Sequence, residues 1–152
     1  MVVLADALSY ADLRLKPDVI VDIATLTGAA TLALGRRYGA LFSNDEHLAA
    51  AIERAGEASN DKLWRMPLAQ EYLPELDSSV ADLSHVGTKS VGAGAILAAL
   101  FLEQFLGGRR WAHLDIAGPA RAEKSAREVS RGATGFGVRA LLRWLEQAPA
   151  LW

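Results

Sequence analysis

Hydrophobic residues recur along the chain with two different periods, which alternate from one segment to the next. Between Leu4 and Leu15 the apolar positions follow helical spacing, so we expect a helix that ends before Pro17. The stretch "DVIVDIAT" (18–25) is mostly β-branched, which is typical of a strand buried on both faces. The "ATLALG" that follows (30–35) predicts a short helix closed by Gly35.

In the middle of the chain, strand and helix patterns alternate once more before the periodicity ends. "GALFSND" (39–45) predicts a second strand, after which Asn44 or Asp45 caps the helix "EHLAAAIERAGEA". The periodicity fades between Ser59 and Lys89. We interpret this segment as a long surface excursion, and it is anchored by a few apolar residues: Trp64, Met66 and Leu68.

The last third of the chain is again periodic. "GAGAILAALFLEQFLG" (92–107) predicts a helix buried against a sheet, and "RWAHLDIAG" (110–118) predicts a strand. After the polar loop "EKSAREVSRG" (123–132), a final helix has an apolar face made of Val138, Leu141, Leu142 and Leu145. Strands that alternate with helices predict an α/β fold with a parallel or mixed sheet covered on both sides.

Composition narrows the class of protein. The 152 residues suffice for one domain, and 51% of them are hydrophobic. The net charge is −2 and the basic residues are scattered, so no nucleic-acid partner is expected. The absence of cysteine excludes disulfides and thiolate metal sites and favours a cytoplasmic location. The longest apolar run, Val91–Leu102, is shorter than the ~20 residues that span a bilayer, so we expect no membrane helix. The segment "VVLADALSYA" after Met1 lacks the basic region and cleavage site of a signal peptide, so none is expected there.

Two segments have the same form, a buried strand that runs into a turn of small residues. They are "DIATLTGA" (22–29) and "LDIAGPA" (114–120). In open α/β sheets, ligands bind outside the carboxyl ends of the strands. Gly28 and Gly118 lack side chains there, which we interpret as room for a ligand to approach the backbone. These two strand ends are the candidate pocket.

The chemistry of a complete enzyme is not evident in the motifs. His113 and Asp115 share one strand face, which would suit a metal or a general base, but no other ligand accompanies them. We expect both side chains to bond to nearby backbone or to each other. "GFGVRA" (135–140) fits one form of the dinucleotide fingerprint but follows a polar loop, so we interpret its glycines as allowing close packing at the start of the last helix.

Five segments in order resemble consecutive motifs of the cytosolic leucyl aminopeptidases, a family of hexameric two-metal enzymes. They are "VLADALSYA", "DIATLTGA", "GAGAILAALFLEQF", "WAHLDIAGPA" and "GATGFGVRALLRWLE". The resemblance implies a mixed, largely parallel sheet with helices on both faces. It implies that residues 1–152 are the C-terminal portion of the catalytic domain, without the N-terminal domain.

The resemblance also implies that the catalytic and metal-binding residues are absent. In the family, a motif N-T-D-A-E-G-R-L precedes "VLADAL" and supplies two acidic ligands and the arginine that holds a bicarbonate. Met1 stands where that arginine would be, and the remaining ligands lie further upstream. The complete family enzyme carries two divalent ions (manganese or zinc) and bicarbonate. We expect this chain alone to bind none of these and to be inactive.

The resemblance carries over the wall of the substrate pocket, position by position. Thr25, Leu26 and Gly28 line one side, and the backbone of Leu26 also faces the bicarbonate. Ala117 and Ala120 line the other side, and the small residue at 120 leaves room for an apolar substrate side chain. An alternative for Thr25 and Thr27 is that they merely cap the next helix.

The resemblance implies peptide substrates with a free, apolar N-terminal residue and assembly into a homo-oligomer, a hexamer in the family. A truncated sheet would expose an edge and apolar faces, so we expect the chain to associate unless a partner completes it. The alternative to an aminopeptidase fragment is a non-catalytic paralogue that serves as an interaction or oligomerisation module.

Overall fold

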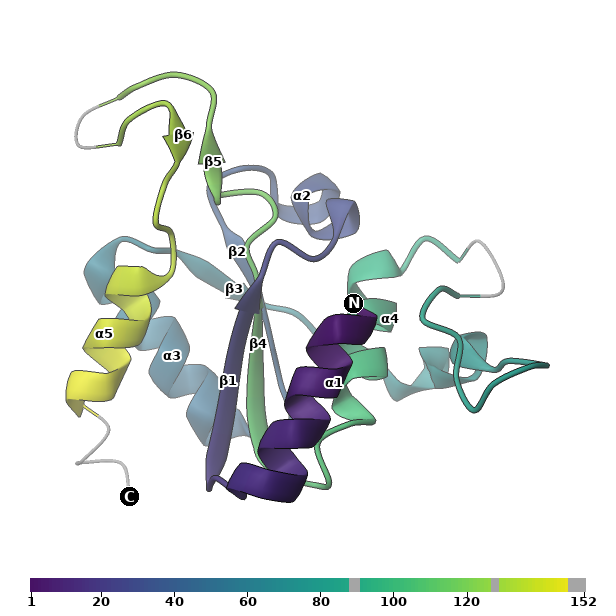
Figure 1. The fold of residues 1–152 in the computed structure, drawn as a ribbon. Coiled ribbons are helices and arrows are strands. Elements are labelled where there is room, and N and C mark those ends of the chain that lie inside the picture. Colours follow the sequence, from purple (N-terminus) through teal and green to yellow (C-terminus); the bar gives the residue numbers. More distant parts are fainter. Residues whose placement is uncertain (88–90, 127–128, 148–152) are drawn as a thin grey trace.

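A four-stranded mixed sheet forms the middle of the computed structural model, which describes residues 1–87, 91–126 and 129–147 (Figure 1). The strands are β1 (Val19–Ala24), β2 (Gly39–Ser43), β3 (Leu63–Arg65) and β4 (Arg110–Asp115), in the spatial order β1-β4-β2-β3. β1 is parallel to β4 and β2 is parallel to β3, whereas β2 and β4 are antiparallel. The predicted mixed α/β sheet is confirmed.

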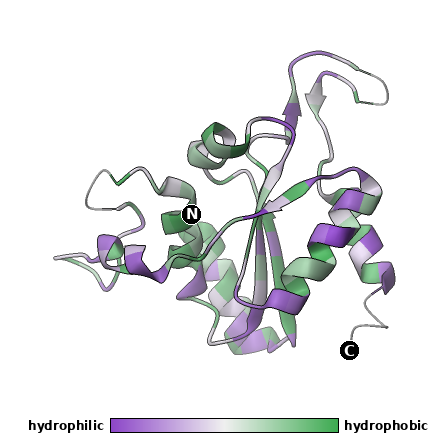
Figure 2. Cartoon of the chain, turned by 180° about the vertical axis from the view of Figure 1, so that it is seen from behind, coloured by the Kyte–Doolittle hydropathy of each residue, from purple (hydrophilic) through white to green (hydrophobic). Residues whose placement is uncertain are grey.

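Helices cover both faces of this sheet, as predicted. α1 (Val2–Tyr10) and α4 (Gly94–Glu103) lie on one face, and α3 (Glu46–Ser59) and α5 (Val138–Gln147) lie on the other (Figure 1). α4 is hydrophobic over nearly its whole length (Figure 2), and seven of its ten residues are buried. A helix that is apolar all round must be enclosed by other elements, and α4 packs between the sheet, α1 and α2.

Shorter elements connect these layers. α2 (Gly28–Leu34) follows β1 and ends at Gly35, whose φ of 70° is readily adopted only by glycine. A 3₁₀ helix (Gln70–Leu76) lies in the predicted excursion. β5 (Arg121–Ala122) and β6 (Gly132–Ala133) form a two-stranded antiparallel ribbon that projects beyond the end of the sheet (Figure 1).

The two sheet faces have separate cores because side chains alternate along each strand. The residues on the face of α1 and α4 are Ile20, Ala40, Phe42 and Trp111. The residues on the face of α3 and α5 are Leu41, Leu63, Ala112 and Leu114. β2, with all five residues buried, contributes to both cores.

Asp45 caps α3, which confirms one of the two predicted caps. Its carboxylate accepts a hydrogen bond from the backbone N–H of Leu48 at 2.7 Å. This bond holds the pKa of Asp45 below its usual value, although partial burial raises it. The guanidinium of Arg110, whose Nε lies 2.9 Å from Oδ2 of Asp45, lowers the pKa further. Asn44, the other candidate, bonds instead to the backbone of Arg109 and Trp111.

The first helix starts earlier than predicted and changes form before it ends. The α-helix spans Val2–Tyr10, and a π-helical turn (Ala11–Leu15) carries the chain to the expected end. Lys16 then adopts the left-handed conformation, with φ of 49°. Pro17 follows, which cannot continue a helix.

β1 is less buried than its apolar sequence predicts. Only Ile20 of its six residues is buried, and the side chain of Ile23 is 39% exposed. β1 is an edge strand, since β4 is its single neighbour among the described residues. The expectation of a strand buried on both faces was therefore wrong for the chain as described.

Two expectations about packing residues also need correction. Trp64 is 57% exposed and meets Tyr38 edge-on, whereas Met66 and Leu68 do pack against the core as predicted. α5 buries Ala140 and Trp144 against the sheet side, so most of the predicted apolar face is exposed. The exposed members are Val138, Leu142 and Leu145. Positions 88–89 of the predicted excursion and 127–128 of the polar loop lie outside the described residues.

Candidate functional site

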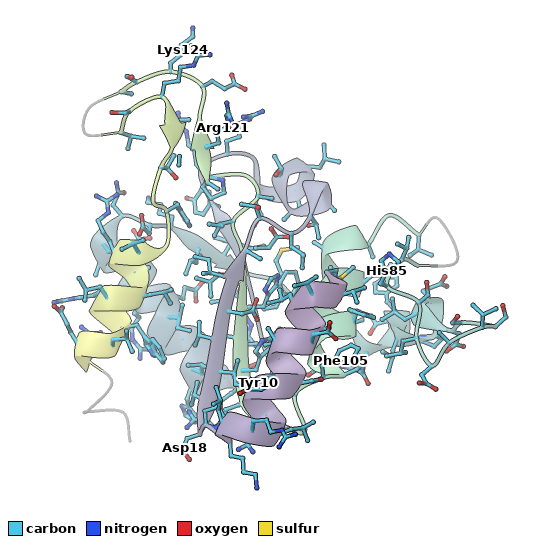
Figure 3. All side chains as sticks on the ribbon, viewed as in Figure 1. Tyr10, Asp18, His85, Phe105, Arg121 and Lys124 are labelled. Carbon is cyan, nitrogen blue, oxygen red and sulfur yellow. The ribbon has the colours of Figure 1, made fainter. Side chains whose placement is uncertain are left out.

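The two predicted strand ends lie next to each other. β1 and β4 are parallel neighbours, and their last residues, Ala24 and Asp115, are paired in register. The segments 25–28 and 117–120 therefore leave the sheet at the same end. This end is near Arg121 in Figure 3 and opposite Asp18, which precedes β1.

Asp115 joins these two segments through its carboxylate. Oδ1 accepts hydrogen bonds from the backbone N–H groups of Leu26 and Ala117, each at 3.1 Å. Oδ2 accepts from the N–H of Thr27 at 3.0 Å and from its hydroxyl at 2.6 Å. The side chain is buried, and four donors occupy its acceptor positions. Asp115 is therefore a structural clamp, and its oxygens are not available to a metal ion.

Thr27 continues this network into α2. Its backbone is extended, and its hydroxyl oxygen accepts a hydrogen bond from the N–H of Ala30 at 3.0 Å, which makes it the N-cap of the helix. The capping alternative is thus correct for Thr27. Thr25 is exposed at the strand end and Leu26 is half-buried against the core.

His113 points to the same face of β4 as Asp115, as the period of a strand requires, but the two side chains do not bond to each other. The Nδ1 atom of His113 lies 2.6 Å from Oδ1 of Asp22, on the neighbouring strand β1. The indole N–H of Trp111 donates to the other oxygen of Asp22 at 2.7 Å. Both oxygens of this carboxylate are thus used inside the protein.

Sequence reasoning missed Asp22. The only signal for it was a charged residue in the middle of an otherwise apolar strand, and its partners lie about 90 positions away. Its role is structural, because it joins β1 to β4 and fixes the buried imidazole. Nowhere in the described ranges do three or more His, Cys, Asp or Glu side chains come together as a possible metal site.

The glycines and alanines of the candidate pocket have different surroundings. A Cβ atom on Gly28 would meet nothing within 4 Å, so the space in front of it is open. A Cβ atom on Gly118 would overlap the backbone carbonyl oxygen of Gly35. The interpretation of Gly118 as room for a ligand was therefore wrong: it is small because the end of α2 packs on it. Ala117 and Ala120 are half-buried.

Gly137, in the fragment that fits a dinucleotide fingerprint, allows close packing. Its φ is 93°, and a Cβ atom there would overlap the side chain of Ile23 on β1. The expectation of close packing at the start of the last helix is thus confirmed. None of the described helices has the length and hydrophobicity to cross a membrane.

Comparison with known proteins agrees with the geometry. Residues 1–142 match the catalytic domain of the cytosol aminopeptidase family. A probable cytosol aminopeptidase of Chlorobium limicola is 52% identical over 146 residues, which are 95% of this chain and 28% of that protein. One from Synechococcus is 50% identical over 93% of this chain and 27% of its own length.

A solved structure shows the same fold. A tomato leucine aminopeptidase mutant superimposes with a TM-score of 0.84 and 42% identity, over 93% of this chain and 27% of that one. The chain thus spans a little over a quarter of the length of the relatives it matches. On the family match, the sequence identity and the shared fold together, the chain belongs to the cytosol aminopeptidase family, whose catalytic domain it represents in part.

Proposed function

We propose that this chain is the C-terminal, substrate-binding part of a metal-dependent leucyl aminopeptidase that hydrolyses N-terminal apolar residues from peptides. Thr25, Leu26 and Gly28 form one wall of the side-chain pocket, and Ala117 and Ala120 form the other. The observation that carries the proposal is the Asp115 clamp, which holds both walls at one end of the sheet. Half-buried alanines and an open Gly28 suit an apolar substrate side chain.

The residues present do not fit the metal ions of such an enzyme. Asp22 and Asp115, the carboxylates nearest the strand ends, are both engaged in internal hydrogen bonds. The two divalent ions (manganese or zinc) would therefore bind to residues outside this chain, and so would most of the bicarbonate's partners. The Leu26 N–H is directed at Asp115, so a bicarbonate at the backbone of Leu26 would share this donor.

The remaining parts of the proposal rest on family membership. Relatives are called cytosol aminopeptidases, which supports peptide substrates and a cytoplasmic location. The exposed apolar side chains of α5 support assembly with further copies, as in a hexamer.

A chimera tests the proposal directly. The matching 146 residues of the Chlorobium limicola relative would be replaced by this chain, at 52% identity. We expect the chimera to release leucine from leucine p-nitroanilide in a metal-dependent reaction, and this chain alone to release none. In the chimera, Ala120→Phe should lower kcat/KM for leucine substrates at least tenfold more than for alanine substrates, because the larger side chain fills the pocket.

Ala58→Phe serves as the matched control, since Ala58 lies on α3, away from both walls. A chimera that folds but releases no leucine would refute the proposed function. So would an Ala120→Phe chimera with unchanged preference between leucine and alanine. Hydrolysis by the isolated chain would refute the claim that the metal ligands lie outside it.

A further inference from the structure

A cavity of about 320 Å³ lies beside the candidate pocket and has a different chemical character. Three loops form most of it: the turn after α2, the turn between α3 and β3, and the segment that leads into α5. Pro119, from the 117–120 segment, completes the wall. The cavity is thus separated from the proposed side-chain pocket by a single loop.

Positive charge dominates this cavity. Among the described residues that line it, four are cations and one is an anion: Arg36, Arg37, Lys62, Arg139 and Asp61. They are dispersed in the sequence, so the pattern of basic residues along the chain does not reveal them. Folding brings them together because the turns at 36–37 and 60–62 both lead into neighbouring strands, β2 and β3, at the same end of the sheet.

Asp61, the one anion among the described lining residues, is already compensated by the protein. Asp61 is buried, and its Oδ2 accepts hydrogen bonds from the backbone N–H groups of Gly137 at 3.1 Å and Ala140 at 3.2 Å. Its Oδ1 lies 3.4 Å from the guanidinium of Arg139. The carboxylate therefore compensates the positive end of α5 and one arginine, and does not cancel the other three cations.

The other three cations that line the cavity form only weak ion pairs or none with the described residues of the protein. Arg36 pairs with Glu123 at 3.0 Å and Lys62 with Glu57 at 3.9 Å, and both glutamates are largely exposed. Exposed pairs of this kind are weak, so a ligand can displace them. Within the described part of the chain, Arg37 forms no ion pair.

We propose that this cavity is a binding site for a small phosphate-bearing molecule, with its phosphates at Arg37 and Lys62. Arginine binds phosphate oxygens in a bidentate manner and lysine adds a point charge, so the lining matches an anion with several oxygens. The volume exceeds what one phosphate needs, and Phe136 supplies an aromatic surface for an attached group. The residues of this site are not those of the proposed peptide pocket. A failure of the phosphate-binding test would therefore leave the proposed function untouched, and the reverse also holds.

Titration calorimetry on the purified 152-residue chain tests the site, in 0.15 M salt to suppress non-specific attraction. Pyrophosphate probes the phosphate groups alone, and ADP adds a nucleoside that Phe136 can contact. We expect saturable binding of at least one probe, weakened at least tenfold by Arg37→Ala combined with Lys62→Ala. Both side chains are solvent-accessible at the surface, so the double variant should keep the wild-type melting temperature.

Arg54→Ala is the matched control, an exposed arginine on α3 outside the cavity, and should change the dissociation constant less than twofold. Equal affinity for pyrophosphate and ADP would indicate a site for phosphate alone, and tighter binding of ADP would assign the aromatic wall to the nucleoside. Absence of saturable binding by both probes, or an equal loss in Arg54→Ala, would overturn the proposal.

Discussion

Replacing Asp115 by asparagine tests whether this carboxylate holds the two walls of the pocket together. The amide keeps the shape of the side chain but turns one acceptor oxygen into an NH₂ group. That group would face two donors, whichever way the amide is turned: either the two from Thr27, or the N–H groups of Leu26 and Ala117. The Thr27 hydroxyl can also accept a hydrogen bond from the amide, so the orientation toward Thr27 loses one bond, that of the Thr27 N–H, and the other orientation loses two.

The expected cost follows from the strength of the lost bonds. A hydrogen bond to a charged group contributes about 1.5–3 kcal/mol, and neighbouring bonds are not fully additive. In the orientation that loses one bond, Asp115→Asn should lower the free energy of unfolding by about 1.5–3 kcal/mol. Asp18→Asn is the control, because Asp18 is exposed at the other end of β1 (Figure 3) and should change stability by less than about 0.5 kcal/mol.

Urea unfolding followed by tryptophan fluorescence measures both variants at one protein concentration. Hydrogen exchange gives the local measurement. The amides of Leu26, Thr27 and Ala117 should exchange faster in Asp115→Asn than in the wild type, while the exchange rates of the α3 amides should keep the same order relative to one another. If Asp115→Asn is as stable as Asp18→Asn, or if those three amides stay protected, the clamp does not stabilise the site.

Three further predictions concern packing, charge and association. Gly118→Ala should cost about 1–3 kcal/mol, because its Cβ would overlap a backbone carbonyl, while Gly28→Ala should lie within about 0.5 kcal/mol of the wild type in the same urea titrations; a reversed order would contradict the packing described. The lowered pKa of Asp45 means that its carboxylate stabilises the fold above the unfolded value near 3.8 and loses this effect as pH falls through the lower folded value. Asp45→Asn keeps the cap, so it should be less stable than the wild type at pH 7, and the gap in melting temperature should shrink as the pH falls below the unfolded value near 3.8; a gap independent of pH would exclude a role for the charge. Leu142→Lys, on the exposed side of α5, should lower the mass measured by light scattering, and an unchanged mass at every concentration would show that this face makes no contact between copies.

Local patterns predicted the elements well, because their causes are local. Asp45 begins α3 through its side-chain cap, Gly35 ends α2 through its backbone conformation, and β4 could be located from its apolar run. The meeting of the two strand ends also followed from the sequence, since parallel strands place their carboxyl ends at one edge.

What could not be predicted depends on contacts between distant segments. The partner of His113 is set by the register between β1 and β4, so Asp22 could not be identified as its partner. Gly118 is small because of the end of α2, a contact that no spacing within "DIAGPA" reveals. The cationic cavity likewise exists only where turns after α2 and α3 come together.

The parallel pairing of β1 with β4 has a consequence for synthesis of the chain. Paired residues such as Asp22 and His113 are 91 positions apart, so β1 leaves the ribosome long before its partner strand is made. During that interval its backbone lacks the strand β4 with which it pairs, and contacts this distant form slowly because a long loop must close first. Translation pauses or chaperone capture in the segment between them should therefore influence the yield of native protein more than changes after β4.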